Sequence, residues 1–188
     1  MLSERLGHFL DKPLASFAGR IPLSPNSITI TGFLITVAAA SLIPSHPLVG
    51  GLLILAGGAF DMLDGVIARS RSGGTKFGAF LDSTLDRYSD SVIFIALAWS
   101  FLSEGQPVGA LFAAGGLVGA LLTSYVRARA EGLGIACQVG IIERPERVLI
   151  IALGCITGLL YPAAVLLFFL GHITVIQRIR HVYRVADR

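Results

Sequence analysis

Long apolar stretches alternate with short polar breaks along most of the chain. Six of these stretches are close to the length of about 20 residues that a helix needs to cross a bilayer. They cover residues 27–43, 48–69, 77–102, 107–126, 146–161 and 163–180. The breaks between them contain helix-interrupting prolines, at Pro44, Pro47, Pro107, Pro145 and Pro162. The pattern predicts an all-α integral membrane protein with six spanning helices in a single domain, residues 1–188.

The N-terminal segment has a different pattern. Apolar residues such as Leu2, Leu6 and Phe9 recur at helical intervals, but charged residues including Asp11 and Lys12 lie between them. A helix with one apolar and one charged face lies in the plane of the membrane interface. We therefore expect residues 2–21 to form an interfacial amphipathic helix.

The composition excludes a water-soluble protein. The 188 residues are 54% hydrophobic and only 14% charged, whereas soluble domains carry about a quarter charged residues. Six spans use nearly the whole chain, so no separate soluble domain fits beside them.

The basic residues lie on one side of the expected bundle. With six spans and both termini on the same side, all 15 Lys and Arg residues fall on that side or at span ends facing it. The opposite loops, near 44–47, 103–106 and 161–162, contain none. Positive charge marks the cytoplasmic side. We expect a multi-pass cell-membrane protein whose termini and functional face are cytoplasmic.

Five aspartates fall inside the expected second and third spans. Asp61 and Asp64 are three residues apart and Asp82 and Asp86 are four apart, so each pair lies on one helix face. Carboxylates inside a membrane are costly and indicate a functional site. Asp90 lies one turn further along, and we interpret it as making an ion pair with a nearby basic residue or a contact between helices.

The other four aspartates are suited to binding metal ions. If the two helices run antiparallel, their carboxylates converge near the cytoplasmic end, where like charges need protons or cations. Oxygen-only ligands favour Mg²⁺, Mn²⁺ or Ca²⁺ over zinc. Two such ions would neutralise four carboxylates, and paired metals are suited to phosphoryl chemistry. The alternative is a set of ion pairs with neighbouring basic residues, Arg69, Arg71, Lys76 and Arg87.

The aspartates belong to a longer motif. Residues 61–86 read D-x2-D-G-x2-A-R-x8-G-x3-D-x3-D, with fixed positions at Asp61, Asp64, Gly65, Ala68, Arg69, Gly78, Asp82 and Asp86. The motif resembles the signature of the CDP-alcohol phosphotransferase family at every fixed position. The resemblance implies six membrane helices with an interfacial N-terminal helix, and a homodimer. It also implies transfer of the phosphatidyl group of CDP-diacylglycerol to an alcohol, with release of CMP.

The resemblance also implies residue roles. Two divalent cations, Mg²⁺ or Mn²⁺, are held by Asp61, Asp64, Asp82 and Asp86, and Asp86 is also the general base for the acceptor hydroxyl. The CDP-lipid is contacted by Ser24, Pro25, Asn26, Ser27, Thr29, Gly65, Ala68, Arg69, Thr75 and Gly78. For each residue from Ser24 to Thr29, ordinary capping of a helix start is an equally good interpretation.

Arginines gather at the cytoplasmic ends of the last three spans. We expect four of them to form a pocket for the phosphate of a phosphorylated acceptor: Arg127, Arg144, Arg147 and Arg178. The segments FDMLDG, DRYSD and IIERPERV resemble the branch of the family whose acceptor is inositol phosphate. Arg127 stands where that branch commonly has Lys. Contact with anionic lipid headgroups is the alternative explanation of these arginines.

Other functions remain compatible with the sequence. Within the family, the acceptor could be glycerol phosphate, or the lipid could be the ether-linked archaeal counterpart. A divalent-cation transporter would also need carboxylates in the membrane, but these lie toward one face and no inverted repeat is evident. No Walker A loop or dinucleotide fingerprint is present, and no nucleic-acid partner is expected. The sequence favours a lipid-linked phosphotransferase.

Overall fold

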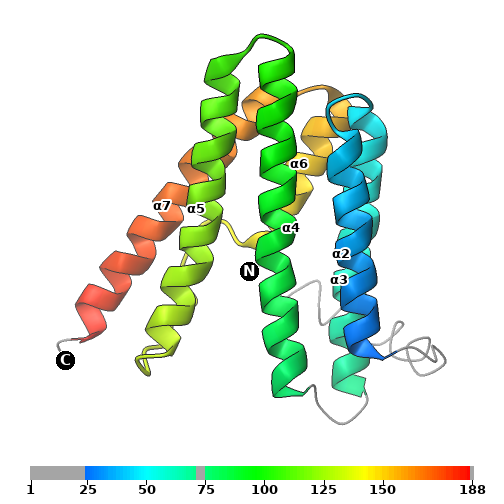
Figure 1. Cartoon of the computed structure of the whole chain (residues 1–188). Helices are drawn as coiled ribbons and strands as arrows, with labels where there is room; N and C mark the ends of the chain where they lie inside the picture. Colours follow the sequence, from blue (N-terminus) through cyan, green and yellow to red (C-terminus); the bar gives the residue numbers. More distant parts are fainter. Residues whose placement is uncertain (1–23, 71–74, 187–188) are drawn as a thin grey trace.

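The computed structural model describes residues 24–70 and 75–186, except for the side chains of residues 62–70. Its elements are α2 (Pro25–Leu42), α3 (Pro47–Ser70), α4 (Lys76–Ser103), α5 (Pro107–Glu131), α6 (Arg144–Thr157) and α7 (Leu160–Ala186). Every regular element in these residues is a helix, which confirms the all-α prediction (Figure 1). The interfacial helix predicted for residues 2–21 lies outside the described residues.

Local capping explains where the first helices begin. Ser24 is the N-cap of α2, and its hydroxyl accepts a hydrogen bond from the backbone N–H of Ser27 at 3.2 Å. Thr75 caps α4 in the same way, accepting from the N–H of Gly78 at 2.9 Å. Pro25 supplies the fixed backbone angle that suits a first helical turn. These signals are readable in the sequence, so the predicted and observed starts of α2 to α5 agree closely.

The boundary between the last two helices differs from the prediction. The sequence predicts spans at 146–161 and 163–180, separated at Pro162, but α6 ends at Thr157 and α7 begins at Leu160. Gly158 ends α6 because it adopts a left-handed conformation, with φ of 75°. Pro162 instead lies in the first turn of α7, where its missing N–H breaks no helical hydrogen bond.

The segment between α5 and α6, residues 132–143, folds back into the bundle. Side chains of α7 anchor its backbone: Thr174 accepts from the N–H of Ile142 at 3.2 Å, and Arg178 donates to the carbonyl of Val139 at 2.8 Å. Cys137 and Ile142 are fully buried. In Figure 1 the segment rises from the end of α5 toward the middle of the bundle, where α6 begins. Irregular backbone at membrane depth needs such burial within protein.

Small residues allow the helices to approach closely. α2 contacts α3 and α4, α5 contacts α4 and α7, and α6 contacts α3 and α7. At the crossing of α5 and α7, a Cβ on Gly171 would lie 3.4 Å from the backbone of Gly119. Ala113 and Ala152 are completely buried at other contacts. Close helix packing of this kind stabilises membrane bundles, in which the hydrophobic effect contributes little between helices.

The contact between α3 and α6 provides a stability prediction. A Cβ on Gly51 would lie 2.8 Å from both the carbonyl oxygen of Ala152 and the Cβ of Cys155. Because neither atom is at the end of a flexible side chain, Gly51→Ala is expected to lower the free energy of unfolding by about 1–3 kcal/mol. Melting temperatures in one detergent would measure the effect. Gly58→Ala is the matched control, since its Cβ would make only an ordinary contact with Val148, at 3.6 Å. Equal melting temperatures for the two variants would contradict the prediction.

Three of the described helices, α2, α5 and α7, are long and apolar enough to cross a membrane. α3 contributes a shorter apolar stretch, Pro47–Asp61. α4 has 28 residues, which is ample length, but it carries Asp82, Asp86 and Asp90. These carboxylates are the charged residues that distinguish α4 from the uninterrupted apolar helices.

Candidate active site

An acidic cavity lies between α3, α4 and α6. Asp61 from α3 and Asp82 and Asp86 from α4 line it, together with Arg144 from α6, and its volume is about 420 Å³. The side chain of Asp61 also reaches α2, where its Oδ1 would lie 3.0 Å from a Cβ built on Gly32. The structure therefore brings together three of the four aspartates predicted to bind metal. The side chain of the fourth, Asp64, is outside the described part.

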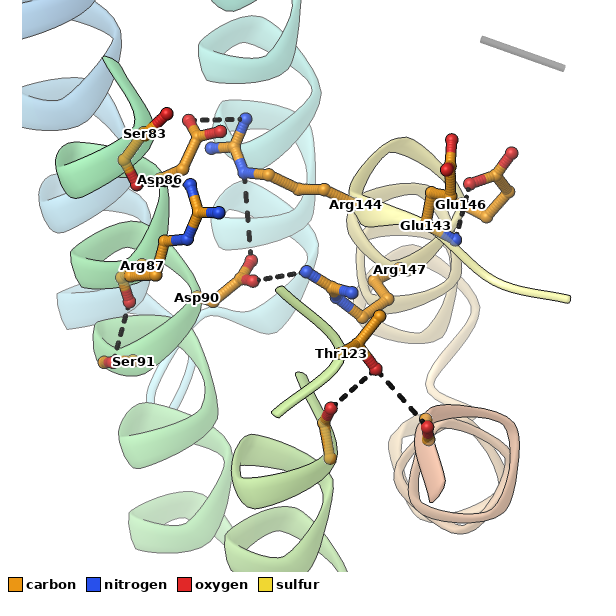
Figure 2. Close-up of polar contacts among 12 residues, drawn as sticks. Ser83, Asp86, Arg87, Asp90, Ser91, Thr123, Glu143, Arg144, Glu146 and Arg147 are labelled. Atoms are coloured by element: carbon orange, nitrogen blue, oxygen red, sulfur yellow. Dashed lines mark hydrogen bonds and ion pairs between the residues drawn. The ribbon is translucent and has the colours of Figure 1, made fainter. Parts of the chain in front are cut away.

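Arg144 lies between two of these carboxylates. Its Nη1 donates to Asp61 Oδ2 at 2.5 Å and lies 3.0 Å from Asp86 Oδ1. Its Nε lies 3.9 Å from Asp90 Oδ1 (Figure 2). The sequence predicts an acceptor role for Arg144, whereas in this structure the guanidinium joins α3 and α4 through their acidic side chains.

Asp90 pairs with a basic residue, as its interpretation from the sequence has it, but the partner, Arg147, lies 57 residues further along the chain. Its Oδ2 accepts a hydrogen bond from Arg147 Nη2 at 2.7 Å (Figure 2). Both side chains are almost completely buried, with 6% of Asp90 and 2% of Arg147 exposed. A buried ion pair of this kind costs several kcal/mol when one partner is removed, because the other charge is left uncompensated.

A second, basic cavity adjoins the first. Its volume is about 370 Å³, and all four arginines predicted to bind the acceptor line it: Arg127, Arg144, Arg147 and Arg178. Asp86 and Arg144 line both cavities. The two predicted groups of charged residues are therefore neighbours, and they meet at the residue expected to act as the general base.

Glu143 stands among the arginines of the basic cavity. Its Oε1 lies 3.3 Å from Arg127 Nη1 and 3.6 Å from Arg178 Nη2. Arg127 also pairs with Glu131 at 2.9 Å. Arg178 uses two further nitrogens on backbone carbonyls, those of Val139 and Thr123. Arg178 therefore holds the 132–143 segment in place as well as lining the cavity.

Glu143 was not among the residues predicted from the sequence. Its local signal is the spacing Glu143-x-x-Glu146, which forms a capping box at the start of α6. That box fixes the first turn of α6. It therefore fixes the backbone positions from which the side chains of Arg144 and Arg147 extend. The position of Glu143 beside two arginines, Arg144 and Arg147, was the clue available in the sequence.

The residues predicted to bind the CDP-lipid are only partly described. Asn26, Thr75 and Gly78 lie together, since a Cβ on Gly78 would be 3.0 Å from Asn26 Oδ1 and 3.1 Å from Thr75 Oγ1. Ser24 and Ser27 hydrogen bond to each other at 2.8 Å, and Thr29 donates to the carbonyl of Pro25 at 3.0 Å. These local bonds agree with the capping interpretation. Gly65, Ala68 and Arg69 lie where side chains are not described.

Among the side chains that the structure describes, no group of three or more His, Cys, Asp or Glu residues is arranged to hold a metal ion. The guanidinium of Arg144 stands between Asp61 and Asp86, and the side chain of Asp64 lies outside the described part. The described donors are all carboxylate oxygens, the type that Mg²⁺ and Mn²⁺ prefer.

Comparisons with known proteins identify the family of the chain. The family model for CDP-alcohol phosphatidyltransferases matches residues 22–179. The archaetidylinositol phosphate synthase of Methanothermobacter thermautotrophicus is 45% identical over 174 residues, which are 89% of this chain and 87% of that protein. A crystal structure of Mycobacterium tuberculosis phosphatidylinositol phosphate synthase with CDP-DAG bound matches with a TM-score of 0.82 and 35% identity, over 92% of this chain and 93% of that one. The same synthase in complex with manganese and citrate matches with the same score and identity, over 92% and 88% of the two chains.

The fold and site define a membrane-embedded transferase with an acidic and a basic cavity side by side. The chain belongs to the CDP-alcohol phosphatidyltransferase family, as the aspartate motif predicts. Members of this family are enzymes, so a purely structural membrane subunit and a cation transporter are both excluded.

Proposed function

We propose that this enzyme transfers the phosphatidyl group of CDP-diacylglycerol to a hydroxyl of inositol phosphate, giving phosphatidylinositol phosphate and CMP. This proposal rests on one observation: Asp86 and Arg144 line both the acidic and the basic cavity. A nucleotide diphosphate needs a site for cations, and a phosphorylated acceptor needs arginines. Both are available within one continuous site.

The reaction follows from this arrangement. The acceptor hydroxyl, with its phosphate held by the arginines, attacks the lipid phosphorus, while Asp86 accepts its proton. A bond forms between the acceptor oxygen and phosphorus, and the bond from phosphorus to the CMP oxygen breaks. We assign acceptor binding to Arg127, Arg144, Arg147 and Arg178.

Two divalent cations, Mg²⁺ or Mn²⁺, fit the acidic cavity in our proposal. Asp61, Asp64, Asp82 and Asp86 would hold them, and when bound they would neutralise the pyrophosphate and the charge that develops on it. The oxygen-only donor set supports this assignment. A second support is the guanidinium between Asp61 and Asp86, since this space already accommodates a positive charge. The manganese complex of the mycobacterial synthase is consistent with it.

The CDP-lipid is assigned to the side of the acidic cavity nearer α2 and the start of α4. The meeting of Asn26, Thr75 and Gly78 supports a nucleotide contact there. The remaining contacts are assigned from the family motif: Ser24, Pro25, Ser27, Thr29, Gly65, Ala68 and Arg69. The related archaetidylinositol phosphate synthase and the mycobacterial phosphatidylinositol phosphate synthase are both named for inositol phosphate products. Their names differ in the lipid part, so an ether-linked CDP-lipid is the second candidate donor.

The membrane arrangement is part of the same proposal. All six helices, α2 to α7, cross the membrane of the cell as one domain, residues 1–188, and residues 2–21 lie in the interface. The starts of α2 and α4 and the ends of α5 and α7 lie at one end of the bundle (Figure 1). This end carries Arg127, Arg129, Arg180 and Arg184, which supports a cytoplasmic active site and cytoplasmic termini. The functional unit is a homodimer.

CMP release by the purified full-length protein tests the function. With CDP-diacylglycerol and Mg²⁺ or Mn²⁺, we expect turnover with inositol phosphate, because it offers both a hydroxyl and an anion for the arginines. Free inositol and serine should be poor acceptors, since they leave several guanidinium groups without an anion. Preference for glycerol phosphate would overturn the proposed acceptor. Parallel reactions with an ether-linked CDP-lipid would identify the donor, and a chelator should abolish turnover reversibly.

A further inference from the structure

Arg144 occupies a position that the proposed reaction does not by itself explain. It is the first residue of α6, and the capping box of Glu143 and Glu146 fixes the backbone on either side of it. From there its side chain reaches across to Asp61 on α3 and Asp86 on α4, at 2.5 and 3.0 Å. These are two of the carboxylates to which we assign the metal ions.

The charges at this place explain why a guanidinium lies there. Asp61, Asp82 and Asp86 line one cavity, and like charges at a partly buried site repel unless a cation neutralises them. The side chain of Arg144 is 22% exposed, so its interaction with the carboxylates is only partly screened by solvent. Divalent ions held by the same oxygens would repel the guanidinium. Arg144 and the metal ions cannot both occupy this position.

The guanidinium of Arg144 has a second possible position, in the basic cavity near Asp90. Its Nε is buried without a hydrogen-bond partner among the described residues, and it faces Asp90 Oδ1 at 3.9 Å (Figure 2). Arg144 already lines the basic cavity. A small change in its side-chain angles would therefore move the guanidinium from Asp61 toward Asp90 and the acceptor arginines, with its charge still paired.

We propose that Arg144 is an internal counter-cation, which occupies the carboxylates of the metal-free enzyme and is displaced into the basic cavity when divalent cations bind. This rests on the proposed function, because it assumes that Asp61 and Asp86 are metal ligands. Its consequence is an order of events: Arg144 becomes available to the acceptor phosphate only after the metal site is loaded. Arg144 thus links the two halves of the site.

Metal affinity tests the proposal without turnover. Binding of Mn²⁺ to the full-length protein would be measured by electron paramagnetic resonance of the free ion, with no substrate present. Arg144→Gln removes the competing charge, so the dissociation constant for Mn²⁺ should fall by about tenfold or more, equivalent to ~1.4 kcal/mol. The same substitution should lower the melting temperature in chelator, because Asp61 and Asp86 lose the guanidinium that pairs with them, and Mn²⁺ should restore it.

Arg87→Gln is the matched control for loss of a positive charge. Arg87 lines the same basic cavity, but its Nη1 donates to the carbonyl of Ser83. No close ion pair joins it to the described carboxylates and its hydrogen bond to Ser83 is exposed, so its replacement should change the Mn²⁺ dissociation constant by no more than about threefold. Unchanged or weaker Mn²⁺ binding in Arg144→Gln, or an equal gain in both variants, would overturn the proposal. If the wild type itself bound no Mn²⁺, the metal assignment of the proposed function would fail together with it.

The wild-type protein provides a second readout that needs no variant to fold. Phenylglyoxal modifies accessible arginines, and mass spectrometry assigns the modified positions. Addition of Mn²⁺ should make modification of Arg144 several-fold faster, because the guanidinium leaves its close pairs with Asp61 and Asp86 for the basic cavity, where its nearest carboxylate, that of Asp90, is already paired with Arg147. Arg129, which is exposed in the last turn of α5, should be unaffected. A rate at Arg144 that stays the same or falls on addition of Mn²⁺ would identify Arg144 as a fixed brace and overturn the proposal.

Discussion

Replacing Asp86 with Asn is expected to lower kcat by about 10²–10⁴-fold, the usual contribution of a positioned general base. Asp86 is the carboxylate that lines both cavities, so it is the one within reach of an acceptor held by the arginines and of a lipid phosphate held at the acidic side. Asn has the same shape but accepts no proton at neutral pH. CMP release would measure kcat, and stabilisation of the protein by CDP-lipid would measure donor binding, which should weaken much less.

Two comparisons make this prediction specific. Asp61→Asn and Asp82→Asn should also abolish turnover at ordinary metal concentrations, but a higher metal concentration should restore part of it, because they lose a ligand and not the base. Asp90→Asn changes the same residue type one helical turn beyond Asp86. It should act on acceptor binding through Arg147 and leave most of kcat intact. Normal turnover in Asp86→Asn would exclude Asp86 as the base.

Local signals explain the parts of the fold that could be predicted. Prolines, N-cap residues and apolar stretches of spanning length mark the starts of α2 to α5, and all of these act within one or two turns. The break between α6 and α7 was misplaced because both Gly158 and Pro162 are helix-ending signals. The structure distinguishes the two signals, because Gly158 has the left-handed backbone that ends α6.

The path of residues 132–143 is a different case. It depends on Thr174 and Arg178, which lie 32 and 39 residues away from their partners Ile142 and Val139. The pattern of apolar and polar residues within the segment does not predict contacts with residues so far away in the sequence. The buried entry of the chain into α6, and with it the position of Glu143, therefore required the structure.

The composition of the site was more predictable than its pairing. Aspartates three and four residues apart inside apolar helices indicated the acidic cavity, because charge is costly there. Their basic partner was not predictable. The sequence suggested neighbours such as Arg87, whereas Asp61 pairs with Arg144, 83 residues further along the chain. Arg87 instead donates to the carbonyl of Ser83 in its own helix.

The other large effect is expected on acceptor binding, when Arg147 is replaced by Gln. Arg147 lines the basic cavity and is held there by Asp90 at 2.7 Å. A charge-assisted contact with a phosphate contributes about 1.5–3 kcal/mol, so the KM for inositol phosphate should rise by roughly one to two decades. The KM for CDP-diacylglycerol should change much less. Arg129→Gln, an exposed arginine of α5, should change neither value and is the matched control.

Loss of Arg147 alone also leaves Asp90 buried without its partner, which is expected to destabilise the protein by about 3–5 kcal/mol. The double variant Asp90→Asn, Arg147→Gln separates the two effects. It replaces the buried ion pair with two neutral amides that can hydrogen bond, so most of the stability should return while the KM for inositol phosphate stays high. If stability and KM both returned to wild-type values, the role of Arg147 would be confined to its ion pair with Asp90. A KM that stays high in the stable double variant would instead mean that the acceptor phosphate depends on the positive charge of Arg147, and lipid headgroups alone would not account for the arginines of this cavity.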